Sequence, residues 1–90
     1  MNKTELAIAI AERSGVPRTM VSKVLDAATA TIKGTLRKEE NVTLTGFGTF
    51  HVSERAERVG RNPLTGKPIR IAAAKVPKFR AGKGLKEAVQ

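Results

Sequence analysis

The sequence predicts an α+β fold in which a helical hairpin precedes a small antiparallel sheet, a long protruding β-ribbon and a short C-terminal helix. Three observations support this prediction. Apolar residues recur at helical spacing as far as Leu36, and from Val42 onward apolar and polar residues alternate at the period of a strand. The segment GRNPLTGKP at residues 60–68 then has the proline and glycine of a tight turn, which marks the tip of the ribbon.

The first helix is expected over residues 3–14. Asn2 stands three residues before Glu5, the spacing of a capping box in which a side-chain oxygen accepts a hydrogen bond from an unpaired helix amide. Gly15 is a natural stop for this helix, because glycine adopts the left-handed conformation that commonly ends helices.

The second helix is expected to follow Pro17. Gly34 interrupts it at a cost of about 1 kcal/mol relative to alanine, which is tolerable near a helix end or where another backbone packs close. The two antiparallel helices then present one apolar face. The apolar stripe of the second helix consists of Val21, Val24, Leu25, Ala28, Ile32 and Leu36.

A charged break, RKEEN at residues 37–41, separates the helices from the strands, and its Glu39 and Glu40 are interpreted as charges that solvate a loop. The alternating residues after this break predict a β-hairpin with Gly46 and Gly48 at its bend.

Two further segments complete the predicted fold. PIRIAAAKVPKF at residues 68–79 has a second β pattern, with Ile69 and Ile71 on one face and Phe79 at its end. The tail AGKGLKEAV at residues 81–89 is expected to form a short closing helix.

Composition limits the kinds of protein that this chain can be. The 90 residues hold no cysteine and one histidine, which excludes disulfides and cysteine-ligated zinc. Domains this small bury only about 60% of their unfolded surface, so oligomerisation is the expected source of further burial. Glu5 and Glu12 interrupt the apolar N-terminal stretch, and no apolar run reaches the ~18 residues of a membrane span. We therefore expect a cytoplasmic protein that uses no metal, cofactor or membrane.

Positive charge is concentrated in the second half of the chain. The net charge is +9, and residues 1–50 hold 7 basic and 5 acidic side chains, whereas residues 51–90 hold 10 basic and 3 acidic ones. A basic surface of this kind attracts nucleic acid, acidic membrane surfaces or acidic proteins, and charge alone does not choose among them.

Residues 53–76 are expected to form an arm, a two-stranded ribbon that protrudes from the body. Asn62 suits the first position of a type I turn, Pro63 presets φ at the second, and Gly66 supplies a left-handed residue that closes the hairpin through a bulge. The ribbon has little apolar area to bury, so we expect it to be mobile until a partner fills its concave side. Its cations are Arg55, Arg58, Arg61, Lys67, Arg70 and Lys75, opposed by Glu54 and Glu57.

The spacing of the arm arginines indicates cations on both faces of the ribbon. Side chains alternate between the faces of a strand, so Arg55, Arg58 and Arg61 switch faces. Cations on both faces suit a narrow groove such as the DNA minor groove, about 6 Å wide, although strong ribbon twist would reconcile this spacing with one face. The alternative is a solvated edge ribbon whose Lys and Arg side chains deter aggregation.

Five segments together carry a family resemblance. They are MNKTEL at 1–6, GFGTF at 46–50, GRNPLTG at 60–66, AAAKVPKF at 72–79 and GKGLK at 82–86. In this combination the chain resembles the bacterial histone-like proteins of the HU and integration host factor family over residues 1–90, as a single domain. The resemblance implies an intertwined homodimer that binds double-stranded DNA in the minor groove through two β-arms. It further implies wrapping, bending and kinking of DNA, compaction of the nucleoid, and association with it.

The resemblance also implies which residues act. Pro63 is expected to be a wedge inserted between base pairs, with Leu64 as its support. Lys78 and Arg80 lie near the base of the arm and are either DNA contacts or plain surface. Ser53 stands where the family frequently has a basic residue, and Pro17 where it typically has a capping serine or threonine. The implied DNA contacts are Lys3, Arg55, Arg58, Arg61, Asn62, Pro63, Lys67, Arg70, Lys75, Lys83 and Lys86, and the implied dimer core is Phe47, Phe50 and Phe79.

Other functions fit the same residues less well. An enzyme is disfavoured because His51 is the sole histidine and no nucleophile stands with it, and Gly46 and Gly48 form only a lone G-x-G. A helix-turn-helix reader is disfavoured because the candidate recognition helix has few base-reading side chains. RNA binding stays open, although with three Phe, no Tyr and no Trp a stacking platform is poorly supplied. The segment VPKFRAGKGLK at residues 76–86 favours HU over integration host factor, and a heterodimer with a paralogous subunit also stays open.

Overall fold

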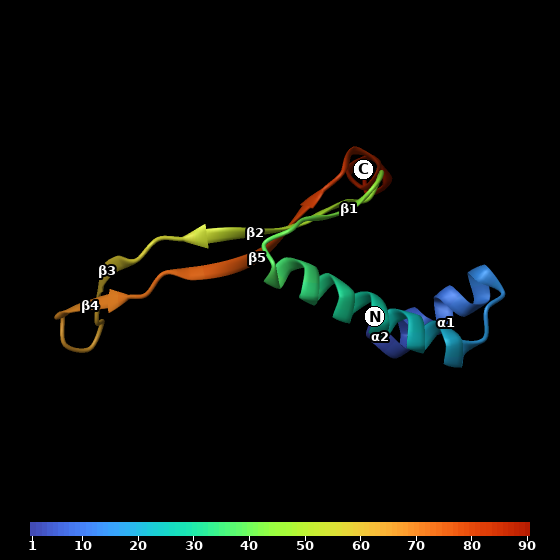
Figure 1. Cartoon of the computed structure of the whole chain (residues 1–90), viewed down its shortest axis with the longest axis horizontal. Coiled ribbons are helices and arrows are strands. Elements are labelled where there is room, and N and C mark those ends of the chain that lie inside the picture. Colours follow the sequence, from blue (N-terminus) through green and yellow to red (C-terminus); the bar gives the residue numbers. More distant parts are fainter. The chain divides into compact units, whose positions relative to one another are not determined.

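The computed structural model describes all 90 residues and contains three α-helices and five β-strands (Figure 1). The chain divides into two compact units, residues 1–34 and 35–90, which we call the helical unit and the sheet unit. The elements are α1 (Lys3–Ser14), α2 (Arg18–Arg37), β1 (Val42–Leu44), β2 (Gly48–Arg55), β3 (Arg58–Arg61), β4 (Pro68–Ile71), β5 (Ala74–Ala81) and α3 (Lys83–Ala88). The predicted order of helices and strands is thereby confirmed.

Both ends of α1 are capped as the sequence predicts. The Oδ1 atom of Asn2 accepts a hydrogen bond from the Glu5 N–H at 2.8 Å. Gly15 has a φ of 75°, in the left-handed region, and its N–H donates to the Ala11 carbonyl oxygen at 2.9 Å. The second helix, α2, begins directly after Pro17, also as predicted.

The helical unit buries little of its apolar surface. Ala7 and Val21, with 3% and 4% of their surface exposed, are the only buried hydrophobic residues of the chain. Met20 and Val24 are 57% and 65% exposed. An apolar hollow of about 230 Å³ lies open in the same unit, lined by Ile10, Ser14, Val16, Val21, Val24 and Leu25. The predicted apolar face therefore exists, and within one chain it is largely uncovered. Neither α2 nor any shorter helix has the length and apolar character needed to cross a membrane.

The sheet unit is built on a three-stranded antiparallel sheet with the order β1-β2-β5. Eight residue pairs join β2 to β5, from Gly48 opposite Ala81 to Arg55 opposite Ala74. Figure 1 shows these two strands leading toward the tip loop of the arm, with α3 at the other end of the unit.

The hairpin between β1 and β2 turns at Gly46, one of the two glycines predicted at the bend, whereas Gly48 is the first residue of β2 and pairs with Leu44. Gly46 has a φ of 81°, and the Phe47 N–H donates to the Leu44 carbonyl oxygen at 2.9 Å. The Phe47 carbonyl oxygen in turn accepts a hydrogen bond from the Gly82 N–H at 2.8 Å, which ties this hairpin to the start of α3.

Beyond β2 and β5 the chain forms a separate two-stranded ladder of β3 with β4. Ala72 and Ala73 belong to neither β4 nor β5, so the prediction of one unbroken β pattern over residues 68–79 is wrong at these two positions. The residues on both sides of Ala72 and Ala73 produced the β pattern that the prediction relied on. The alanines themselves add little to a strand, because their short side chains pack poorly across it. Ile69 and Ile71 do share one face of the ladder, as predicted.

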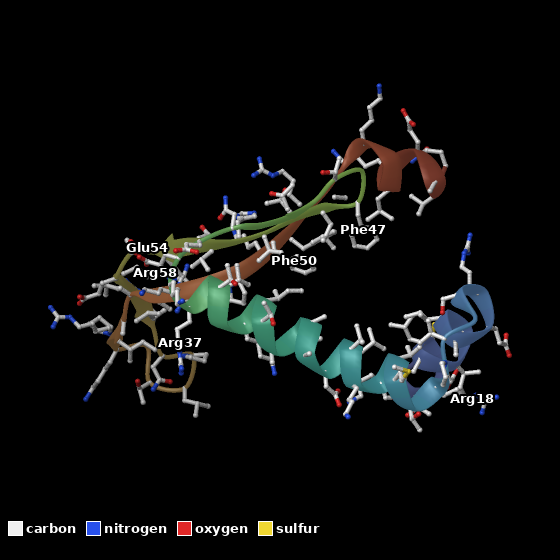
Figure 2. All side chains as sticks on the ribbon, turned by 45° about the vertical axis from the view of Figure 1, so that its right-hand side comes forward. Arg18, Arg37, Phe47, Phe50, Glu54 and Arg58 are labelled. Atoms are coloured by element: carbon white, nitrogen blue, oxygen red, sulfur yellow. The ribbon has the colours of Figure 1, made fainter.

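The three phenylalanines form one cluster in the sheet unit. The register sets Phe50 directly opposite Phe79, with ring centroids 4.8 Å apart, and the Phe47 and Phe79 rings are 5.6 Å apart. Figure 2 shows Phe47 and Phe50 on the same side of the sheet. Phe47 and Phe79 are still 47% and 41% exposed within the single chain. The cluster therefore orders the sheet without closing a core.

Close packing at Gly48 makes this cluster sensitive to one added methyl group. A Cβ built on Gly48 would lie 2.7 Å from the carbonyl oxygen of Arg80 and would overlap the Phe79 ring. We expect Gly48→Ala to lower the free energy of unfolding by about 1–3 kcal/mol, because overpacking forces the backbone to shift. Thermal unfolding followed by circular dichroism measures this loss.

The matched control is Gly60→Ala in the β3–β4 ladder. There the one tight contact of the added Cβ would be with the Cδ1 atom of Ile71, at 3.0 Å, and this flexible side-chain end can move away. Equal unfolding midpoints for Gly48→Ala and the parent would contradict the packing argument.

Candidate nucleic-acid interface

The arm carries its cations on both faces, as the spacing of the arginines indicates. The β3–β4 register places Arg61 and Arg70 on one face and Arg58 on the other, together with Ile69 and Ile71. Arg58 begins β3, beyond the end of β2 at Arg55. Both faces of the ladder can therefore meet phosphate groups.

The tip loop is held by hydrogen bonds centred on Asn62. Its backbone N–H donates to the Lys67 carbonyl oxygen at 2.9 Å, and its carbonyl oxygen accepts from the Gly66 N–H at 2.7 Å. Its side-chain Oδ1 accepts from the Leu64 N–H at 2.9 Å. Gly66 has a φ of 70°, so the predicted left-handed residue is confirmed.

This geometry presents the two apolar residues of the tip to solvent. Pro63 is exposed, and Leu64 is 93% exposed, the largest fraction among the exposed large hydrophobic residues. Asn62 has a structural task in the turn whether or not it also contacts DNA, because its Oδ1 already accepts a hydrogen bond.

Two of the predicted body contacts have carboxylate partners. In the helical unit, the Lys3 Nζ lies 2.6 Å from the Asp26 Oδ1. In the sheet unit, the Lys83 Nζ lies 3.9 Å from the Glu87 Oε1, one helical turn along α3. All four side chains are more than half exposed, so each pair contributes about 0–1 kcal/mol and a phosphate can replace the carboxylate. Lys86 occupies the last turn of α3.

On the arm, the remaining predicted contacts lie along the ribbon. Arg70 forms an ion pair with Glu57, which lies between β2 and β3. Arg55 ends β2, and Lys67 stands between the tip and β4, both exposed. The sheet unit thus gathers every predicted arm contact, together with Lys83 and Lys86. Lys3 is the one predicted contact in the helical unit.

At the base of the arm, Lys75 forms an ion pair with a residue that follows α2. Its Nζ is 3.1 Å from the Glu39 Oε1, and the register sets Glu54 directly opposite Lys75. The hydrogen bond to Lys75 and the positive charge of Lys75 hold the pKa of the Glu39 carboxyl below its ordinary value, so this pair is intact at neutral pH. Glu39 is exposed in the turn after α2, as expected of a loop charge, and the ion pair with Lys75 is the part that the sequence did not predict.

Comparison with known proteins identifies the family. Residues 1–90 match the family model described as bacterial DNA-binding protein. The chain belongs to this family. The HU-beta protein of Neisseria meningitidis serogroup A is 56% identical over 89 residues, which cover 99% of this chain and 100% of that protein. The HU-beta protein of Pseudomonas aeruginosa is 55% identical over 89 residues, or 99% of each chain.

A solved structure of this family has the same fold. The Anabaena HU–DNA cocrystal structure superposes with a TM-score of 0.92 at 45% identity, covering 99% of this chain and 97% of that chain. The HU resemblance and the α+β fold expected from the sequence are thereby confirmed.

The tip hydrogen bonds lead to a prediction that isolates the role of Asn62 in the turn. Asn62→Ala removes the acceptor for the Leu64 N–H, so we expect faster amide exchange at Leu64 and Gly66. We expect little change in the global unfolding midpoint, because the tip buries no core residue. Amide exchange followed by NMR measures both.

Asn62→Asp is the matched control, because it keeps an oxygen acceptor at the same place. If the Leu64 amide exchanged at the parent's rate in Asn62→Ala as well as in Asn62→Asp, this would contradict the idea that the hydrogen bond to Leu64 holds the tip.

Proposed function

We propose that this architectural DNA-binding protein wraps, bends and kinks double-stranded DNA through the arms, residues 53–76, of two subunits. The observation that carries this proposal is a ribbon with cations on both faces that ends in an exposed apolar tip. Family membership over residues 1–90 and the likeness to a protein solved in complex with DNA support it. The family is one of DNA-binding proteins, and we propose no catalytic role.

The minor groove is the part of DNA that suits this arm. It is about 6 Å wide with a phosphate wall on each side, so a narrow ribbon with Arg58 on one face and Arg61 and Arg70 on the other can reach both walls. Such contacts neutralise phosphates and carry little sequence information, because the degenerate pattern of this groove distinguishes mainly A·T from G·C. We therefore propose sequence-tolerant binding and association with the nucleoid.

Pro63 is the proposed wedge. An apolar ring inserted at a base step costs a few kcal/mol of unstacking, and the bent DNA then contacts more of the protein surface. The hydrogen bonds of Asn62 support this role, because they hold Pro63 and Leu64 at the end of the ribbon.

A homodimer is the proposed assembly, formed by intertwined copies of the single domain 1–90. Its support is the apolar surface that one chain leaves uncovered: Met20 and Val24 in the helical unit, and Phe47 and Phe79 in the sheet unit. We propose that Phe47, Phe50 and Phe79 become part of the dimer core. Two arms related by a twofold axis would then produce two kinks.

The body contacts complete the proposed path of the DNA. Lys3, Lys83 and Lys86 are proposed to bind phosphates beyond the arms. For Lys3 and Lys83 this requires that phosphate replace the carboxylates of Asp26 and Glu87, which is feasible because both ion pairs are exposed.

The first prediction of this proposal concerns salt. If about 6 to 10 phosphates are engaged, affinity for a linear duplex should fall about 10³- to 10⁵-fold between about 50 and about 200 mM salt, because bound counterions are released from DNA. Titrations followed by fluorescence anisotropy, on two duplexes of unrelated sequence, measure this slope. A shallow slope, or a large difference between the two duplexes, would contradict phosphate-dominated binding.

The second prediction concerns the wedge. We expect the parent to bind nicked, gapped or prebent duplexes more tightly than linear ones, because prebending removes part of the deformation cost. Pro63→Ala should weaken binding to the flexible duplexes by about five- to thirty-fold, the cost of losing one buried apolar ring. Mobility-shift titrations of both proteins on all duplexes give the comparison.

Leu64→Ala is the comparison variant, because it removes an apolar side chain from the same tip and leaves the ring of Pro63 in place. It should weaken binding less than Pro63→Ala does. Equal affinity of the parent for all duplexes, unchanged by Pro63→Ala, would mean that the tip is only a turn.

A further inference from the structure

The ion pair between Glu39 and Lys75 joins the end of α2 to the base of the arm. Lys75 is the second residue of β5, and Glu39 follows α2 by two residues. Their charged atoms are 3.1 Å apart, and the two side chains are 59% and 46% exposed. Both residues lie in the sheet unit.

Glu39 occupies a backbone position that usually belongs to glycine. Its φ is 62°, which makes it the only non-glycine residue of the chain with a positive φ. The Glu39 N–H donates to the Leu36 carbonyl oxygen at 2.9 Å and the Glu40 N–H to the Thr35 carbonyl oxygen at 3.2 Å, the two hydrogen bonds of a Schellman motif. Glycine would end the helix here without the steric cost of a Cβ.

The side chain of Glu39 offers a reason for this costly choice. A glycine at the same place would end α2 equally well and would leave Lys75 without its closest carboxylate. Backbone strain at a residue with a specific side-chain contact is the kind of outlier that points to a function.

The charge balance at the base of the arm differs from that along the rest of the ribbon. The Glu39 carboxylate is the one that forms an ion pair with Lys75, and Glu54 is the residue opposite Lys75 in the β2–β5 register. Lys75, Glu54 and Arg55 also line one open hollow of about 440 Å³. A phosphate that enters this hollow can reach Lys75 and Arg55, and at Lys75 it meets an ammonium group that is already paired with a carboxylate.

We propose that the Glu39 carboxylate competes with DNA phosphate for Lys75. This competition makes the affinity of the arm base for DNA lower than it would be if Lys75 had no carboxylate partner. The inference rests on the proposed function, because it assumes that DNA passes the base of the arm. Lys75 is then a conditional contact, engaged only when phosphate replaces Glu39. Arg55 has no such partner among the ion pairs of the chain and binds phosphate without this exchange.

The opposite role would be a brace, in which Glu39 holds the arm base in its binding geometry. The two roles differ in the sign of one effect. Removing the carboxylate of a competitor tightens DNA binding, whereas removing that of a brace weakens it.

The experiment compares the parent with Glu39→Gln on a gapped duplex at several salt concentrations. We expect Glu39→Gln to bind about two- to ten-fold more tightly, which corresponds to releasing one exposed ion pair per arm in a protein with two arms. The salt dependence should steepen by about one unit for each Lys75 released.

Three further variants identify the cause. Glu40→Gln removes the same charge one residue away, where the structure has no ion pair, and so measures the effect of net charge alone. Glu39→Gly should tighten binding as much as Glu39→Gln does, although only glycine also relieves the backbone. In a Lys75→Gln background, the gain from Glu39→Gln should fall to the level of Glu40→Gln.

The outcomes separate the two proposals. If the parent binds no duplex, the proposed function fails and the inference fails with it. If the parent binds DNA but Glu39→Gln binds no more tightly than Glu40→Gln, or more weakly than the parent, the competition is overturned and the proposed function stands. If Glu39→Gly bound more tightly and Glu39→Gln did not, the effect would come from the backbone, and the competition would again be overturned.

Discussion

The antiparallel pairing of β2 with β5 is the constraint on which the rest of the sheet unit depends. Its register sets Phe50 against Phe79 at one end, where the aromatic cluster forms, and Glu54 against Lys75 at the other. The same pairing brings the two strands to the start of the arm side by side, so the tip loop closes between Asn62 and Lys67. A shift of this register by one residue would move every one of these side chains to the other face of the sheet.

Local sequence signals predicted most of the elements, because their causes lie within a few residues. The cap at Asn2, the left-handed Gly15 and Gly66, and the turn at the tip all depend on neighbours in the chain, and all are confirmed. The opposite faces of Arg58 and Arg61 also followed from simple alternation, because a strand has a period of two residues, whereas the face of Arg70 depends on the register of β3 with β4.

The missed features depend on residues far apart in the sequence or on context that composition does not reveal. The partners of Lys3 and Lys75 are brought near by folding, and no spacing in the sequence links Asp26 or Glu39 to them. The Glu87 partner of Lys83 did have a signal, the spacing of one helical turn. The break at Ala72 and Ala73 was hidden because residues on both sides continued the alternation.

The interruption between the two ladders lets the β3–β4 ladder change in sequence independently of the β1-β2-β5 sheet. The β3–β4 ladder shares no residue pair with the β1-β2-β5 sheet, so a substitution at Val59 or Ile69 disturbs contacts that the sheet does not use. Effects at sites without shared partners tend to add independently. The residues of the outer arm can therefore change to suit a different DNA geometry while the body keeps its fold, and selection on one need not trade against the other.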